Sequence, residues 1–181
     1  MNNKVLLHIC CGICALESIN RLIRQQYIVI GYFFNPNIYP EEEYLKRKQV
    51  VENVAEIYNI NVIYDEKYDH HLWQKICGIY ENEPEGGKRC LLCYELRLKK
   101  TYEIMEKENF DFFTTTLTIS PYKKSKLIFD IGEKIGGEKF LKIDFKKQDG
   151  YKKTIELAKN FGFYRQNHCG CEFSMKRDTH L

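Results

Sequence analysis

Cysteine is the residue type with the most obvious chemistry in this chain of 181 residues, which contains eight of them. Seven fall into three groups and one stands alone: Cys10, Cys11 and Cys14; Cys90 and Cys93; Cys169 and Cys171; and Cys77. Grouped thiolates are typical ligands of zinc and of iron–sulfur clusters. No secretion signal is recognisable at the start of the sequence, so we expect a cytoplasmic protein whose thiols stay reduced.

The first cysteine group follows a predicted strand and precedes a predicted helix. An apolar run covers residues 5–9, Cys10 and Cys11 come next, and apolar residues then recur at helical spacing over 15–24. In an open α/β sheet, the turn after the first strand is where a ligand usually binds. Adjacent cysteines on a regular strand face opposite ways, whereas a turn can present both to one metal. We expect Cys14 to face the same pocket without being required as a ligand.

The second group, Cys90 and Cys93, follows two basic residues and opens a predicted helix. Positive charge and a helix N-terminus both favour thiolates. With the first group they offer four thiolates, which suit an iron–sulfur cluster or structural zinc. Adjacent cysteines at a strand end fit poorly to the paired knuckles of a zinc ribbon, so the pattern favours iron–sulfur; zinc and unbound thiols stay open. The lone Cys77 is interpreted as a small buried hydrophobic residue.

The third group, Cys169 and Cys171, is separated by one glycine. A disulfide between residues so close in sequence is strained and therefore easily reduced. Two interpretations compete for this pair: a redox dithiol that supplies electrons, or a bidentate ligand for another metal. Two plain surface thiols are the third alternative.

The elements that must position these residues alternate between strand and helix. Apolar and β-branched runs predict strands at 5–9, 27–34, 60–64, 110–116 and 140–143, and helical spacing predicts helices at 15–24, 41–58, 69–79, 88–108, 125–135 and 150–160. Such alternation is typical of parallel βαβ units. We therefore expect one α/β domain over residues 1–181, with a doubly wound, mostly parallel, five-stranded Rossmann-like sheet in three layers. A metal-site insertion is expected at about 65–93 and a redox tail at about 164–181.

Composition limits the classes of partner. The net charge is only +3, which by itself does not point to nucleic acid, and no apolar run approaches the ~20 residues of a membrane span. We therefore expect no membrane partner. Basic stretches at 46–48 and 123–126 are better explained as solvated helix faces, although the interleaved tyrosines keep an RNA surface open.

Taken together, the motifs resemble one known family, the cobalamin-independent epoxyqueuosine reductases (QueH). The matching segments run in order along the chain: 7–14 (LHICCGIC), 34–38 (FNPNI), 83–93 (EPEGGKRCLLC), 120–123 (SPYK), 144–147 (DFKK) and 164–171 (YRQNHCGC). Ile13 departs from the proline common in the family, and His168 from a usual aromatic residue; neither departure affects a proposed role.

The resemblance implies an adenine-nucleotide alpha-hydrolase-like (HUP-like) fold and a 4Fe-4S cluster with Cys10, Cys11, Cys90 and Cys93 as ligands. It also implies a redox-active pair at Cys169 and Cys171 and leaves open an additional mononuclear iron near Cys14. The implied reaction converts epoxyqueuosine to queuosine at the wobble position of tRNA, with an electron donor that the sequence does not identify.

Removing the epoxide oxygen as water requires two electrons, two protons and a general acid. Tyr122, Asp144 and His8 are candidates for that acid by motif position. A structural hydrogen bond is at least as good an interpretation of each, and for His8, inside a predicted strand, a core contact is the better one. Asn35, Asn37 and Lys123 lie in turns after the strands expected to flank the first one, where they could hold a nucleobase or a phosphate.

Two other functions stay open at this stage. One is a zinc-stabilised RNA-binding module without catalysis. The other is an ATP-using tRNA-thiolation enzyme on the same fold, which is weakened because the first turn lacks the Gly- and Ser-rich residues that bind phosphate.

Overall fold

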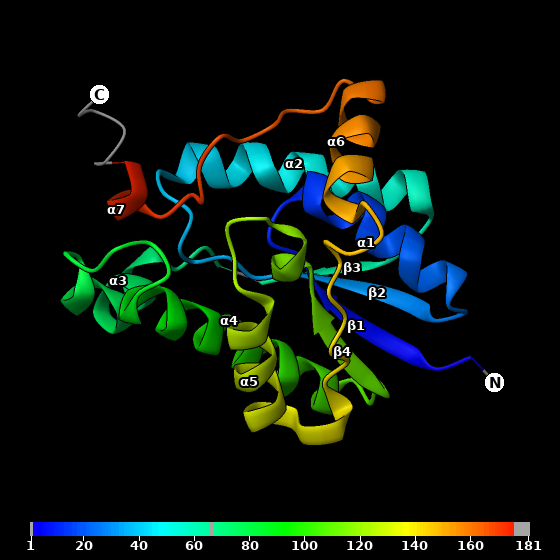
Figure 1. Cartoon of the computed structure of the whole chain (residues 1–181), viewed down its shortest axis with the longest axis horizontal. Coiled ribbons are helices and arrows are strands. Elements are labelled where there is room, and N and C mark those ends of the chain that lie inside the picture. Colours follow the sequence, from blue (N-terminus) through cyan, green and yellow to red (C-terminus); the bar gives the residue numbers. More distant parts are fainter. Residues whose placement is uncertain (1, 66, 176–181) are drawn as a thin grey trace.

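The computed structural model describes residues 2–65 and 67–175 and contains a central sheet covered by helices on both faces (Figure 1). The strands are β1 (Lys4–His8), β2 (Ile28–Phe33), β3 (Val62–Tyr64) and β4 (Phe112–Thr115). The α-helices are α1 (Gly12–Arg24), α2 (Glu41–Tyr58), α3 (His70–Cys77), α4 (Lys88–Lys107), α5 (Ser125–Gly136), α6 (Gly150–Asn160) and α7 (Glu172–Met175). Short 3-10 turns η1 (Gly78–Tyr80), η2 (Thr116–Ile119) and η3 (Gly137–Lys139) complete the elements.

The sheet is entirely parallel, with strand order β3-β2-β1-β4. The parallel α/β architecture is confirmed, but the prediction of five strands is wrong, because the described residues form a sheet of four. Residues 140–143 touch the sheet through a single bridge between Phe140 and Phe113. The Ile143 N–H then bonds back to the Leu141 carbonyl, so the backbone curls away before a second pair can form.

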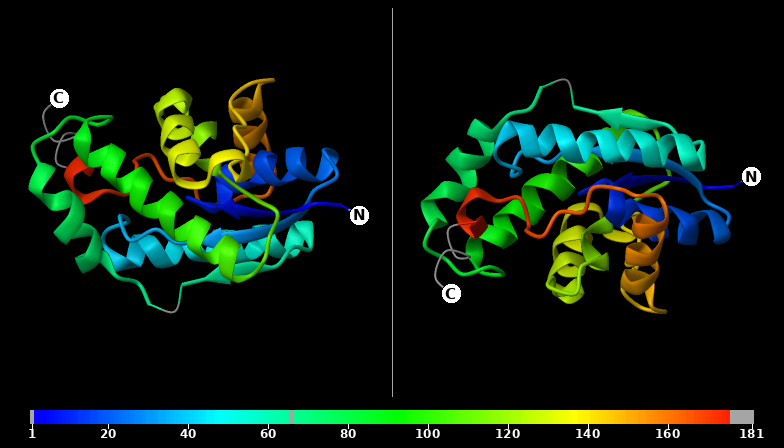
Figure 2. Two further views of the ribbon diagram at one scale, coloured as in Figure 1. Left: turned by 90° about the horizontal axis from the view of Figure 1, so that it is seen from below. Right: turned by 90° about the horizontal axis from the view of Figure 1, so that it is seen from above.

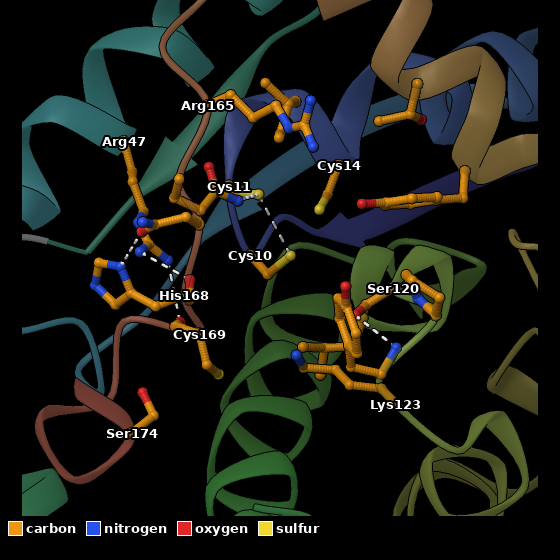
Figure 3. A pocket seen from close by; sticks show the side chains of 18 of the residues that line it. Cys10, Cys11, Cys14, Arg47, Ser120, Lys123, Arg165, His168, Cys169 and Ser174 are labelled. Carbon is orange, nitrogen blue, oxygen red and sulfur yellow. Dashed lines mark hydrogen bonds between the residues drawn. The ribbon is translucent and has the colours of Figure 1, made fainter. Parts of the chain in front are cut away.

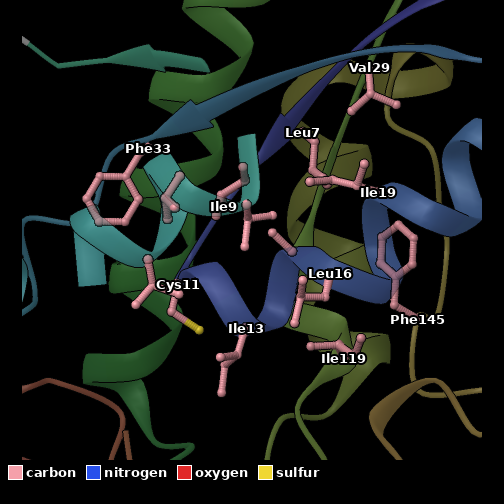
Figure 4. Packing of buried hydrophobic residues seen from close by; sticks show 14 of the residues in the cluster. Leu7, Ile9, Cys11, Ile13, Leu16, Ile19, Val29, Phe33, Ile119 and Phe145 are labelled. Carbon is pink, nitrogen blue, oxygen red and sulfur yellow. The ribbon is translucent and has the colours of Figure 1, made fainter. Parts of the chain in front are cut away.

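Side-chain alternation along β1 produces the three layers. Leu7 and Ile9 join one hydrophobic cluster with α1, α2 and α6, while Leu6 joins a second cluster with α4 and α5. Figure 4 shows the first cluster, in which Leu16 and Ile19 of α1 lie against the sheet. Both clusters consist of side chains that are almost completely buried, so the sheet is covered on both faces, as expected for parallel strands.

The carboxyl ends of β1, β2 and β4 lie at the same edge of the sheet, and β1 is central between the other two. The first helix of the chain starts there, and the 65–93 segment contributes α3, η1 and the start of α4. The segment after α6 crosses to α7, which lies beside α3 (Figure 2). The last part of the predicted tail, 176–181, lies outside the described residues. No helix in the described ranges is long and apolar enough to cross a membrane.

Candidate metal and redox site

The turn after β1 brings the first cysteine group to the carboxyl edge of the sheet. Cys11 is the residue before α1 and has extended backbone geometry, and Gly12 starts the helix. Gly12 is required because a Cβ there would lie 2.5 Å from Val50 Cγ1 and 2.7 Å from the Val50 carbonyl carbon. The absent side chain therefore lets α1 approach α2 closely.

The sulfur atoms of Cys10, Cys11 and Cys14 lie within 4.8 Å of one another, a group that could hold a metal ion. Figure 3 shows the three side chains converging at one end of a pocket. The Thr116 hydroxyl donates a hydrogen bond to Cys10 Sγ at 3.2 Å, and the Gln166 amide donates to Cys11 Sγ at 2.7 Å. Both sulfur atoms are thus already hydrogen-bond acceptors.

The three thiols differ in acidity. Hydrogen bonds from Cys11 and Cys14 lower the pKa of Cys10 well below its ordinary value, and Arg97 and Thr116 act in the same direction against the effect of burial. Burial raises the pKa of Cys11 to about 12, and hydrogen bonding to Cys10 raises that of Cys14. One thiolate held by two thiols is a favourable starting point for metal uptake, since each ligand must lose its proton as the metal binds.

Arg97, on α4, is a buried cation whose described partners are not carboxylates. Its guanidinium donates to Asn35 Oδ1 at 2.5 Å and His8 Nε2 at 3.3 Å and contacts Cys93 Sγ at 3.9 Å. Burial and the Arg97 charge lower the pKa of His8 to about 3, so this imidazole is neutral. A buried guanidinium requires a compensating anion, and Cys10 is the neighbouring thiol whose pKa is lowered. Electrostatic interactions with Cys93, Cys10 and Cys169 outweigh burial and raise the pKa of Arg97.

The second cysteine group starts α4. Cys90 Sγ accepts a hydrogen bond from the Gly86 N–H at 3.2 Å, and Cys93 packs in a small cluster with Trp73, Cys77 and Cys171. Burial raises the pKa of both Cys90 and Cys93. Cys77 is completely buried, in agreement with its interpretation as a hydrophobic residue.

The third group places its two sulfur atoms in different surroundings. Cys169 is half-buried and lines the pocket, whereas Cys171 is 7% exposed and packs against Trp73. Both are free thiols. The glycine between them, Gly170, has a φ of 95°, and the chain bends there between the two cysteines.

The pocket has a volume of about 480 Å³, within the range of small-molecule sites. It is lined by side chains from several separate parts of the chain: Cys10, Cys14, Arg47, Arg97, Ser120, Tyr122, Lys123, Tyr151, Thr154, Arg165, Gln166 and Cys169 among them. Lys123 is half-buried, and although burial opposes its charge, Cys169, Tyr94 and Cys10 raise its pKa. The site therefore combines sulfur on one wall with cationic groups that stay charged.

The structure brings together some of the residues singled out from the sequence and leaves others outside. Those that line the pocket are Cys10, Cys11, Cys14, Tyr122, Lys123 and Cys169. Those that do not are His8, Asn35, Asn37, Cys90, Cys93, Asp144 and Cys171. Asn35 and Asn37 are buried, and Asn35 Nδ2 donates to the Ile9 carbonyl at 2.8 Å. Asp144 pairs with Lys146 at 3.4 Å. Roles for these residues stay predictions.

No role in this site was predicted from the sequence for five of its polar residues, Arg47, Arg97, Thr116, Thr154 and Gln166, although Arg47 lies in the basic stretch 46–48 and Gln166 in the matching segment 164–171. Two others carried a signal. Thr116 ends a run of three threonines at the end of β4, next to β1, and Arg97 lies one helical turn after Cys93. Arg47 and Thr154 sit inside ordinary amphipathic helices, where a single polar residue is not distinctive.

Comparisons with known proteins give a matching family, close relatives and a solved structure of similar fold. The sequence model of the family described as Epoxyqueuosine reductase QueH matches residues 5–177. The Epoxyqueuosine reductase QueH of Staphylococcus epidermidis is 38% identical over 182 residues, covering 94% of this chain and 76% of that protein. That of Thermotoga maritima is 36% identical over 183 residues, covering 97% and 93%. Among solved structures, the U34-tRNA thiolase NcsA from Methanococcus maripaludis with its [4Fe-4S] cluster has a TM-score of 0.56 at 16% identity, covering 96% of this chain and 62% of that one, which supports the fold.

Proposed function

Because the chain belongs to the epoxyqueuosine reductase QueH family, we propose that it reduces epoxyqueuosine to queuosine in tRNA. The observation that carries the proposal is the convergence of Cys10, Cys11, Cys14 and Cys169 on one pocket at the carboxyl edge of the sheet. An epoxide reductase needs electron-supplying groups beside a cavity for a small substrate group, and both are present here. The modified base, at the wobble position of the tRNA, enters this pocket.

A 4Fe-4S cluster bound by Cys10, Cys11, Cys90 and Cys93 is the cofactor in this proposal. These four cysteines suit such a cluster, because Arg97 contacts Cys93 and helps to lower the pKa of Cys10. One buried cation therefore acts on both pairs of proposed ligands. A cluster bound by thiolates carries a net negative charge, which a buried cation of this kind would compensate. When bound, the cluster supplies electrons singly and an iron that can act as a Lewis acid on the epoxide oxygen.

Cys14 offers an alternative to this ligand set, because its sulfur completes the compact group with Cys10 and Cys11. The additional mononuclear iron that the family resemblance leaves open would be held near the same sulfur atom. Measuring iron and sulfide in protein purified without oxygen separates these assignments. Cys90→Ser should abolish the iron–sulfur absorbance and Cys14→Ala should keep it; the reverse pattern assigns the cluster to the compact group. Colourless protein that holds zinc would refute the cofactor and favour an RNA-binding module.

The reduction balances with the tail dithiol as the immediate two-electron source. The epoxide accepts two electrons and two protons, both C–O bonds break, an alkene forms and the oxygen leaves as water. Cys169 and Cys171 lose two electrons and two protons and form a disulfide. An external electron donor then returns the disulfide to the dithiol.

The chain's own residues place and protonate the substrate. Tyr122 lines the pocket with an 81% exposed side chain, so it is better placed than Asp144 to give a proton to the leaving oxygen. Lys123, charged and at the pocket wall, is suited to a phosphate of the tRNA.

Incubation with tRNA that carries epoxyqueuosine tests the function. Mass spectrometry of the digested tRNA should show loss of one oxygen atom from the modified base. Cys169→Ala should keep its iron and lose turnover. Normal turnover by that variant would remove the dithiol from the mechanism, and no turnover by the wild-type protein with a suitable reductant would refute the function.

A further inference from the structure

The segment that carries Cys169 and Cys171 is held by one side chain of α2. Arg47 is 3% exposed, and its Nη1 donates to the Cys169 carbonyl at 3.0 Å while its Nη2 donates to the His168 carbonyl at 3.2 Å. Figure 3 shows Arg47 beside this segment at the edge of the pocket. Both contacts are to the backbone, so they do not depend on the oxidation state of the sulfur atoms.

A carboxylate fixes the orientation of this guanidinium. Glu43, one helical turn before Arg47, accepts its Nε–H at 2.7 Å through Oε1. The second oxygen of Glu43 accepts from the Tyr164 hydroxyl at 2.7 Å, at the start of the same tail. All five N–H bonds of a guanidinium lie in one plane, so anchoring Nε aims the other two nitrogens at the tail carbonyls.

The glycine between the cysteines fits against the same group. Gly170 has a φ of 95°, a conformation that side chains other than glycine rarely adopt, and a Cβ there would lie 2.8 Å from Arg47 Nη1. Its carbonyl accepts from the Tyr39 N–H at 2.8 Å. The loop is therefore shaped to lie directly on the guanidinium, with Cys169 turned to the pocket and Cys171 turned to Trp73.

We propose that Arg47 is a positioning residue for the redox pair: it docks the Cys169–Gly170–Cys171 loop so that one sulfur faces the substrate while the other is withheld from solvent. Its importance for turnover rests on the proposed function. The docking itself does not, since it follows from contacts among residues of this chain.

Alkylation of Cys171 measures the docking without any substrate. Arg47→Lys keeps a positive charge near Glu43, but one ammonium cannot reproduce the planar fork that serves three acceptors. Losing two hydrogen bonds of about the usual net strength should make local opening, and hence Cys171 alkylation, about tenfold faster. Gly170→Ala disturbs the same contact from the other side and should have the same effect.

Arg24→Lys is the control, because Arg24 also pairs with a buried glutamate, Glu17, at 2.6 Å, while no hydrogen bond or ion pair joins Arg24 to the tail among the described residues. Alkylation of Cys171 should be unchanged in that variant. In the Arg47→Lys, Gly170→Ala double variant, the effect should be no larger than in the more affected single variant, since both remove one contact.

Turnover provides the second measurement. Arg47→Lys should lower kcat with little change in KM for the tRNA or in iron content. Unchanged Cys171 alkylation in both variants would overturn the docking proposal even if the protein is an active reductase. Faster alkylation in protein that never reduces epoxyqueuosine would keep the docking and refute the proposed function.

Discussion

Replacing Thr116 by valine should weaken both the fold and iron binding, because one hydroxyl performs two tasks at Cys10. Thr116 Oγ1 accepts the Cys10 N–H at 3.0 Å and donates to Cys10 Sγ at 3.2 Å, and the side chain is completely buried. Valine has nearly the same shape but no hydroxyl. The Cys10 N–H loses its acceptor, which costs about 1–3 kcal/mol of stability.

The second loss concerns the Cys10 sulfur. Hydrogen bonds to charged groups contribute about 1.5–3 kcal/mol, which corresponds to about one to two pKa units on the thiol. After the Cys11 and Cys14 thiols and the Arg97 charge, Thr116 is one of the groups that lower the pKa of Cys10. A less acidic Cys10 should release iron at about tenfold lower chelator concentration, measured by the fading of iron–sulfur absorbance without oxygen.

Thr114→Val is the control for this experiment. Thr114 is also buried on β4 and donates its hydroxyl to the Leu141 carbonyl at 2.9 Å, with no sulfur among its hydrogen-bond partners in the described residues. Both variants should lower the urea midpoint, but only Thr116→Val should lose iron more easily, and Thr116→Ser should restore retention. Equal iron retention in the two valine variants would refute the role of the hydroxyl at Cys10.

Three further outcomes follow from the structure. Thr154 lines the pocket with a buried hydroxyl that has no partner among the described residues, so Thr154→Val should leave the urea midpoint unchanged or higher and raise KM for the tRNA about tenfold. Gly12→Ala should lower the free energy of unfolding by about 3 kcal/mol, because its Cβ would overlap Val50. Burial opposes ionisation of Glu43, yet the hydrogen bond from Tyr164 helps to lower its pKa below 4.5. Its stabilisation is therefore present above that pH and lost below it, so Tyr164→Phe should lower the urea midpoint at neutral pH and much less in acid.

The layered sheet could be predicted from the sequence because buried parallel strands leave a strong apolar signal, as in residues 5–9. The fifth strand could not. Residues 140–143 have strand-like composition, but whether a segment pairs depends on its backbone path, and here the contact with β4 is limited to one bridge at Phe140 and hydrogen bonds of Leu141. A short apolar segment packs equally well as a strand or as a covering loop.

The cysteine group of the pocket could also be predicted, because cysteines that are closely spaced within one turn stay close together in the folded chain. The polar residues around it were less predictable. Asn35 follows β2 as a substrate-binding residue would, yet its amide donates to the Ile9 carbonyl and accepts from Arg97. An asparagine amide can form hydrogen bonds either with the backbone or with a ligand, and the three-dimensional path of the chain decides which of these partners it has.

The different surroundings of Cys169 and Cys171 provide an optical readout. The chain has a single tryptophan, Trp73, and it packs in one cluster with Cys171 and stacks on Phe173 with ring centroids 5.8 Å apart. Thiols and disulfides quench indole emission to different extents when they touch the ring. The intrinsic fluorescence of this protein should therefore follow the oxidation and docking of its C-terminal loop in real time, with no label attached.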